Sequence, residues 1–184
     1  MKGKIILVHG WKETPRSAWY PWLKKELTRR GFEIQIPKMP HPEKPVLQEW
    51  IDVLEKLMDG VEDIILIGHS LGCRAILKFT ENHSVRGIIL VAARVGKSKF
   101  KELEQFYEKD VSWKKVKKNC RKIVGIYSDN DPLVPLRDTE SLRKKLGASI
   151  LIEHGKGHLG GDSGVKELPS VVDTVDVCEK AEGF

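Results

Sequence analysis

The chain has 184 residues, of which 40% are hydrophobic and 32% charged, and its formal net charge is +6 at pH 7. This length suits one domain, expected over residues 1–184, and no apolar run is long enough to cross a membrane. The three cysteines, Cys73, Cys120 and Cys178, are odd in number and widely spaced, which argues against a disulfide framework and a metal knuckle. An apolar strand expected from residue 4 leaves no room for a secretory signal, so we expect a cytoplasmic protein. No motif in the sequence calls for a metal or an organic cofactor, and we expect neither.

Short apolar runs alternate with segments of helical periodicity along the chain. Strands are predicted over residues 4–8, 32–36, 64–67, 85–93, 122–128 and 148–153. Helices are predicted over residues 18–30, 46–58, 71–82, 136–146 and 168–180. This alternation predicts an α/β fold: a three-layer, doubly wound sheet of about six parallel strands, with its ligand site at the carboxyl ends of the strands.

The pentapeptide Gly68-His69-Ser70-Leu71-Gly72 joins the third predicted strand to the helix that follows it. Its glycines stand where a tight strand-to-helix turn has no room for a Cβ atom. Such a turn exposes the serine hydroxyl above the sheet edge and points the helix N-terminus at it. The pattern predicts Ser70 as a nucleophile; the alternative is a surface turn with an idle serine.

A serine hydroxyl needs a base to take its proton, and the base needs a carboxylate to orient it. Asp131 and His158 each follow a predicted strand, and the order Ser, Asp, His is that of the α/β-hydrolase arrangement. Asp131 is preferred to Asp129 because Asp-Pro-Leu-Val-Pro leads straight into the next helix. His158 lies in a glycine-rich loop, and His154 is the second choice for the base.

Acyl transfer also needs hydrogen-bond donors for the developing oxyanion. The backbone N–H groups of Leu71, directly after the nucleophile, and of Trp11, after the first strand, are the expected donors. His9, Gly10 and His69 stand beside these groups and are expected to belong to the substrate-binding surface. Of these, His9 is expected to support its loop by hydrogen bonding, and the His69 side chain to point away from the serine into packing.

Several motifs of the chain together resemble one family of small hydrolases. They are His9-Gly10-Trp11, Trp19-Tyr20-Pro21-Trp22-Leu23, the pentapeptide around Ser70, Asp129-Asn130-Asp131-Pro132, and Gly157-His158. They resemble the serine hydrolases related to retinoblastoma-binding protein nine and the bacterial YdeN-like proteins, over about residues 4 to 175. The resemblance implies a compact α/β-hydrolase with a minimal lid, a Ser-Asp-His triad and esterase-type activity.

The connection from Arg94 to Arg121 is too short for a lid domain, although two short helices could fill it. We therefore expect a shallow site that cleaves small, short-acyl esters as a carboxylesterase does, through an acyl-enzyme intermediate. Thioesterase or acyltransferase chemistry, which uses the same serine, stays open, as does a protein-interaction module that retains the fold.

The positive charge of the chain is concentrated in one stretch. Residues 97–122 hold ten Lys and Arg against four Asp and Glu, which equals the whole net charge of +6. A solvated helical face is one explanation, and an anionic substrate or a protein partner docked on segment 97–122 is the other. This segment carries no recognised nucleic-acid-binding module, so no nucleic acid partner is expected.

Overall fold

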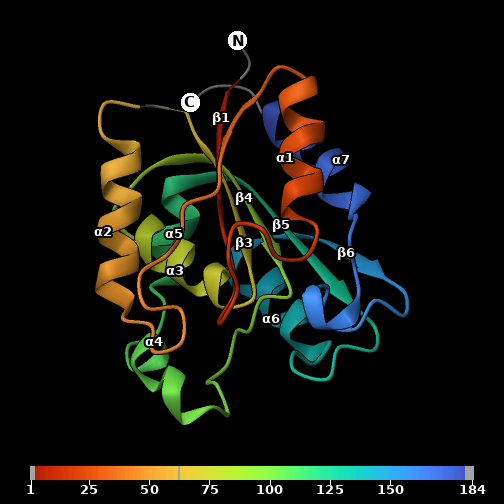
Figure 1. Cartoon of the computed structure of the whole chain (residues 1–184). Coiled ribbons are helices and arrows are strands. Elements are labelled where there is room, and N and C mark those ends of the chain that lie inside the picture. Colours follow the sequence, from red (N-terminus) through yellow and green to blue (C-terminus); the bar gives the residue numbers. More distant parts are fainter. Residues whose placement is uncertain (1–2, 62, 181–184) are drawn as a thin grey trace.

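A computed structural model describes residues 3–61 and 63–180 of the chain. All its strands pair in parallel within one sheet, in the order β2-β1-β3-β4-β5-β6 (Figure 1). The strands are β1 (Lys4–Val8), β2 (Glu33–Gln35), β3 (Ile65–His69), β4 (Val85–Val91), β5 (Cys120–Ser128) and β6 (Ser149–Glu153). The α-helices are α1 (Tyr20–Arg29), α2 (Leu47–Met58), α3 (Leu71–Thr80), α4 (Glu104–Tyr107), α5 (Trp113–Asn119), α6 (Arg137–Leu146) and α7 (Pro169–Glu179). In the described part of the chain, no helix combines the length and the apolar character that crossing a bilayer requires.

The predicted doubly wound, parallel α/β fold is confirmed, and the elements differ from the prediction mainly at their ends. Helix α1 begins at Tyr20 and not at Ala18, because Ala18 has a φ of 48°, outside the right-handed helical region. Strand β4 ends at Val91 and not at Ala93, because Ala92 has a φ of 52°. A turn-forming backbone at an alanine leaves no signal in hydrophobic periodicity.

The alternation of side chains along each strand divides the core into two layers. In β1, Ile6 and Val8 face one layer, which helices α2 to α6 complete. Ile5 and Leu7 face the other layer, which α1 and α7 complete. Figure 1 shows α1 and α7 together on one side of the sheet and α2, α3 and α5 on the other. All four of these side chains are fully buried, as expected for a central parallel strand.

The strand order reverses at β1, since β2 lies on one side of it and β3 on the other. In an open parallel sheet, such a switch point leaves a crevice at the carboxyl ends of the two diverging strands. The chain leaves β1 at His9 and leaves β3 at Ser70, so the crevice lies between the motifs that the sequence places there.

Helix α3 approaches the end of β1 at the distance of backbone contact. A Cβ atom added at Gly72 would overlap the carbonyl oxygen of Val8 and lie 2.8 Å from that of His9. Only glycine permits this approach. The packing of α3 against β1 therefore requires glycine at position 72, the second glycine of the pentapeptide.

The connection between β4 and β5 contains the short helices α4 and α5, as predicted. A 3₁₀ turn over Lys101–Leu103 precedes α4. Leu103, Phe106 and Val116 are buried in the same core layer as α2 and α3. The connection is therefore docked on the body of the protein and does not form a separate lid.

Replacing Gly72 with alanine should destabilise the protein by roughly 2 kcal/mol or more, because the added methyl group meets backbone atoms that cannot move aside independently. Urea unfolding of Gly72→Ala measures the change in the free energy of unfolding. Gly96→Ala is the matched control, since a Cβ atom there meets only the Arg94 side chain, at 3.9 Å. Equal stability of the two variants would contradict the packing argument.

Candidate active site

Ser70 occupies the sharp turn between β3 and α3. Its φ of 51° and ψ of −112° are strained for a residue with a side chain. The backbone of the turn packs closely against itself at Gly68, where an added Cβ atom would lie 2.7 Å from both the nitrogen and the Cα atom of Cys73. The backbone therefore presents Ser70 at the N-terminus of α3, above the carboxyl edge of the sheet.

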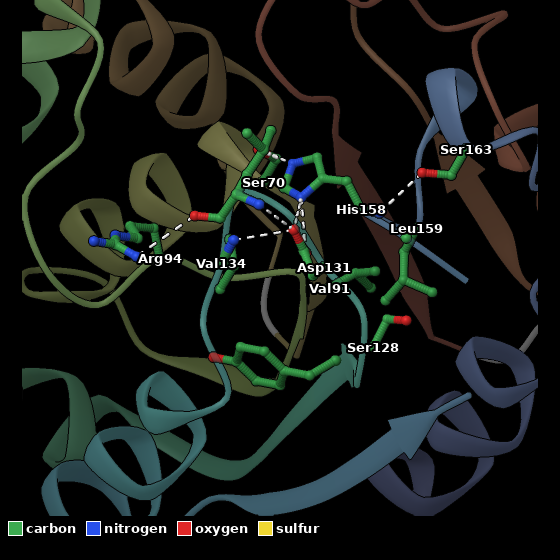
Figure 2. A network of polar contacts seen from close by, with 12 residues as sticks. Ser70, Val91, Arg94, Ser128, Asp131, Val134, His158, Leu159 and Ser163 are labelled. Carbon is green, nitrogen blue, oxygen red and sulfur yellow. Dashed lines mark hydrogen bonds and ion pairs between the residues drawn. The ribbon is translucent and has the colours of Figure 1, made fainter. Parts of the chain in front are cut away.

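Ser70, His158 and Asp131 form a continuous chain of hydrogen bonds (Figure 2). The Nε2 atom of His158 lies 2.8 Å from the Ser70 Oγ atom. The Nδ1 atom lies 2.8 Å from Asp131 Oδ2 and 3.1 Å from Oδ1. The three side chains come from the loops after β3, β5 and β6, so the fold brings together residues that are up to 88 positions apart.

The Asp131 carboxylate is almost completely buried, with 1% of its side chain exposed. Its Oδ1 atom accepts the backbone N–H groups of Leu133 at 2.8 Å and Val134 at 3.0 Å. Burial alone raises the pKa of Asp131, but the hydrogen bond and charge of His158 and these two N–H donors outweigh it, so the pKa is lowered. Asp131 is therefore an ionised carboxylate bound to His158 at neutral pH.

The loop that carries His158 is fixed by side chains around it. The backbone N–H of His158 donates to the Ser163 hydroxyl at 2.9 Å. The N–H of Gly157 donates to Asn130 Oδ1 at 2.8 Å, and the Ser128 hydroxyl donates to the same oxygen. These bonds tie the histidine loop to the end of β5, which carries Asp131.

The structure separates the alternative residues from Ser70. Asp129 accepts hydrogen bonds from the Gly155 N–H at 2.8 Å and from His154 Nδ1 at 2.7 Å. The His154 side chain is 84% exposed. Asp129 therefore supports the turn after β6, and neither residue takes part in the chain of bonds that reaches Ser70.

The predicted oxyanion donors both lie at the cavity beside Ser70. Trp11 and Leu71 are among the residues that line it. Neither backbone N–H donates a hydrogen bond to another group within residues 3–61 and 63–180. Both groups are therefore free to bind an oxygen atom of a ligand.

His69 connects three loops of the site through a buried network. Its Nε2 atom lies 3.0 Å from the backbone carbonyl oxygen of His158, and its Nδ1 atom lies 3.0 Å from Glu13 Oε2. The Tyr20 hydroxyl donates to Glu13 and lies 2.8 Å from the same Nδ1 atom. The N–H of Gly10 donates to Glu13 Oε2 at 2.7 Å. His69 thus links the loops that carry Trp11 and His158.

This network corrects one prediction, because His9 does not belong to the substrate-binding surface; the expectation that it supports its loop is confirmed. His9 is fully buried and does not reach the cavity, because its Nδ1 atom lies 2.8 Å from the Gly10 carbonyl and its Nε2 atom accepts the Met39 N–H at 3.1 Å. His69 lines the cavity, but it is 1% exposed and both ring nitrogens are engaged. Both histidines support loops. Gly10 does line the cavity.

Glu13 and His69 form a buried ion pair. Burial alone raises the pKa of Glu13, but the charge and hydrogen bonds of His69, Tyr20 and Gly10 lower it from 4.5 to about 2. Burial alone lowers the pKa of His69, but the charge and hydrogen bond of Glu13 raise it above its ordinary value of 6.5. An imidazolium explains the geometry, because the carbonyl of His158 and the carboxylate of Glu13 can only accept hydrogen bonds.

A cavity of about 680 Å³ opens beside Ser70 and His158. Apolar side chains from four loops form much of its wall: Trp11, Leu71, Phe100, Leu103, Leu133 and Val134. This volume is typical of small-molecule sites. Within the described residues, no group of three His, Cys, Asp or Glu side chains is placed to hold a metal ion.

The family model described as "Serine hydrolase" matches residues 5–177. The chain belongs to this serine hydrolase family. It is 33% identical to the YdeN protein of Bacillus subtilis (strain 168) over 183 residues, which cover 95% of each chain. It is 28% identical to the serine hydrolase RBBP9 of Rattus norvegicus over 160 residues, which cover 85% of this chain and 86% of that protein. The resemblance inferred from the motifs is confirmed.

Solved structures support the same assignment. The crystal structure of the ydeN gene product from B. subtilis matches with a TM-score of 0.89 and 30% identity, over 96% of this chain and 98% of the other. Est1E from Butyrivibrio proteoclasticus matches with a TM-score of 0.78 at 15% identity, over 98% of this chain and 89% of the other, and so shows a shared fold. The chain is a serine hydrolase with the α/β-hydrolase fold.

Sequence reasoning missed Glu13 and Tyr20 as parts of the site. In the sequence, Tyr20 appears only as part of a family motif at the start of the first helix, and Glu13 appears as a charge in a loop. A carboxylate in the loop after β1, at the ligand-binding edge of the sheet, is the only signal that could have directed attention to Glu13. Its burial depends on contacts with His69, 56 positions away.

The Glu13–His69 ion pair should make stability depend on pH in a specific window. The lowered pKa of Glu13 gives stability that is present above about 4.5 and lost as the pH falls toward about 2. The raised pKa of His69 gives stability that is present below 6.5 and lost as the pH rises through its folded-state value. Glu13→Gln should therefore lower the free energy of unfolding by roughly 3 kcal/mol between pH 4.5 and 6.5, and by less outside this window.

Urea unfolding of both proteins from pH 3 to 9 would measure this difference. The control is Glu49→Gln, which breaks a solvent-exposed ion pair with His41 and should leave stability nearly unchanged at every pH. A Glu13→Gln effect that is the same at all pH values would contradict the ion pair.

Proposed function

We propose that the protein is a carboxylesterase-type enzyme that hydrolyses small, short-acyl esters through an acyl group on Ser70. The observation that carries this proposal is the unbroken chain of hydrogen bonds from Ser70 through His158 to the buried Asp131. Membership of the serine hydrolase family supports the same chemistry.

In the first step, the Ser70 oxygen attacks the ester carbonyl carbon while its proton passes to His158 Nε2. The 2.8 Å distance suits this transfer. Asp131 holds the other ring nitrogen as a donor, which fixes the tautomer, and its negative charge stabilises the imidazolium that forms. The hydrogen bonds from Leu133 and Val134 keep Asp131 itself ionised.

The negative charge of the tetrahedral intermediate is placed on the former carbonyl oxygen. The N–H groups of Trp11 and Leu71 bind this oxygen, and the N-terminal end of α3 adds its dipole. His158 then returns its proton to the leaving alcohol, and the acyl group remains on Ser70. Water, deprotonated by His158 in turn, attacks the acyl-enzyme, and proton return to Ser70 oxygen releases the carboxylic acid.

The small part of the site wall that the β4–β5 connection forms suits a short acyl group. The wall formed by the β4–β5 connection consists of a few side chains, chiefly Phe100, Leu103 and Tyr107. The cavity of about 680 Å³ must hold both the acyl and the alcohol part of the ester. A long acyl chain would leave much of its length in water.

Thioesterase or acyltransferase activity would use the same serine and differ only in leaving group or acceptor.

Treatment with a fluorophosphonate should add one phosphonyl group to the native protein and none to Ser70→Ala or His158→Ala. Such probes react with a serine that a neighbouring base activates. Intact-mass analysis measures the adduct. Ser141→Ala and His154→Ala, which alter a partly exposed serine and the exposed histidine, should label like the native protein. An unlabelled native protein, or a labelled Ser70→Ala, would contradict the proposed nucleophile.

Among 4-nitrophenyl esters, the acetate and the butyrate should have kcat/KM values at least about 10-fold higher than that of the palmitate. The short β4–β5 connection provides little apolar surface for added methylene groups. Initial rates below the micelle-forming concentration of each ester would measure this. A preference for palmitate would show that the acyl chain binds elsewhere and would overturn the short-acyl assignment.

A further inference from the structure

The hydroxyl group of Tyr107 is unused by the protein. Tyr107 lines the cavity, and only 6% of the residue is exposed. Among the described residues, nothing donates a hydrogen bond to this hydroxyl or accepts one from it. The oxygen is not one of the fully buried polar atoms without a partner, so the cavity gives it access to solvent. A hydroxyl so placed is available to a ligand.

Arg74 fixes the position of Tyr107. This arginine lies on α3, one turn after Ser70, and is 3% exposed. Its Nε atom donates to the Phe106 carbonyl at 3.0 Å, and Nη2 donates to that of Lys109 at 2.8 Å. The guanidinium also lies over the Tyr107 ring, 4.9 Å from its centroid. The phenol on α4 is therefore held against α3, the helix that begins directly after Ser70.

Tyr107 is a neutral donor at physiological pH. Burial raises the pKa of its hydroxyl to about 12, although the charges of Arg74 and Arg94 lower it. A neutral phenol donates its proton to an acceptor, and carboxylate oxygens make stronger bonds of this kind than uncharged oxygens do.

Arg94 adds a positive charge to the same cavity. It follows β4, and Figure 2 shows it beside the loop that runs from Asp131 to Val134. Its Nη1 atom lies 3.6 Å from Asp138 Oδ2 and 3.5 Å from the Leu133 carbonyl, while Nη2 has no hydrogen-bond partner among the described residues. The guanidinium is thus held in place with donors left over for a ligand.

The rim of the cavity is also cationic. Lys12 lies over the Trp11 ring, 4.3 Å from its centroid, and Lys99 lies 5.5 Å from the Phe100 ring. Lys12, Arg94 and Lys99 all line the cavity. Three carboxylates line it as well: Glu13 is paired with His69, Asp131 is buried behind His158, and Asp162 has no histidine partner among the described residues. The two exposed lysines and the Nη2 group of Arg94 are therefore the cationic groups that a substrate meets at the rim, although Arg94 also pairs with Asp138.

We propose that the cavity binds esters that carry a carboxylate away from the scissile bond, and that the Tyr107 hydroxyl and the Arg94 guanidinium bind that carboxylate. This inference rests on the proposed ester hydrolysis and adds the class of substrate. It also gives segment 97–122 a role, since Lys99 and Tyr107 belong to it.

Two matched pairs of esters test the proposal, one with the charge on the acyl side and one with the charge on the alcohol side. The first pair is the 4-nitrophenyl monoester of adipic acid and its methyl ester. The second pair is 3-acetoxybenzoate and 3-acetoxybenzamide. The preference is the ratio of kcat/KM for the charged ester to that for its uncharged partner. In at least one pair this preference should be roughly 10-fold or more, and it should fall in 1 M NaCl.

Tyr107→Phe and Arg94→Gln should each reduce that preference roughly 10-fold, because each removes one charge-assisted hydrogen bond. Lys101→Gln is the control: this lysine belongs to the same connection but does not line the cavity, and the preference should be unchanged. The ratio within one variant is insensitive to partial loss of folded protein, since both esters of a pair meet the same enzyme.

The outcomes separate this inference from the proposed function. Hydrolysis of the uncharged esters without a preference for either charged ester would overturn the inference and leave the esterase proposal standing. A preference that Tyr107→Phe and Arg94→Gln both retain would overturn the assigned residues. Failure to hydrolyse any of the four esters, together with no fluorophosphonate labelling, would overturn the proposed function itself.

Discussion

The close approach of helix α3 to strand β1 is the constraint on which the site depends. Gly72 lies against the carbonyl groups of Val8 and His9, and no larger residue fits between them. This contact brings the start of α3 next to the chain that leaves β1, so Leu71 and Trp11 border one cavity. Ser70 sits in the turn that this approach imposes. Ser70 and the two N–H groups proposed as oxyanion donors are thus positioned by backbone packing.

The buried ion pair of Glu13 and His69 extends this arrangement to His158, the proposed general base. The loop after β1 contributes Glu13, the turn after β3 contributes His69, and the loop after β6 contributes the carbonyl of His158. A change in the position of any one of these loops would therefore alter its contacts with the other two. The cost of burying two charges is offset here by their mutual attraction and by the hydrogen bonds from Tyr20 and Gly10.

The sequence predicted the sheet, its helices and the grouping of Ser70, Asp131 and His158, because strands, glycine turns and their order along the chain are local features. It predicted that His9 supports its loop and that the His69 side chain packs inside the protein, as the contacts show, but it was wrong to place His9 on the substrate-binding surface as well. It also missed Glu13, Tyr107 and Arg94. A charged or hydroxyl-bearing side chain can be buried, paired or free, and which of these holds depends on elements far along the chain. Hydrophobic periodicity and motif spacing contain no information about such distant contacts. The sequence ranked Asp129 below Asp131 as the acid, but it did not show that Asp129 binds the loop after β6.

The central claim is that Ser70 carries the acyl group during turnover. The most direct measurement uses 4-nitrophenyl N,N-dimethylcarbamate, because a carbamoyl-enzyme is hydrolysed slowly enough to be isolated. The account predicts that one equivalent of 4-nitrophenol is released and that one carbamoyl group appears on the peptide containing Ser70, as peptide mass spectrometry would show. Continued hydrolysis of 4-nitrophenyl acetate by a protein that carries no carbamoyl group on Ser70 would contradict it.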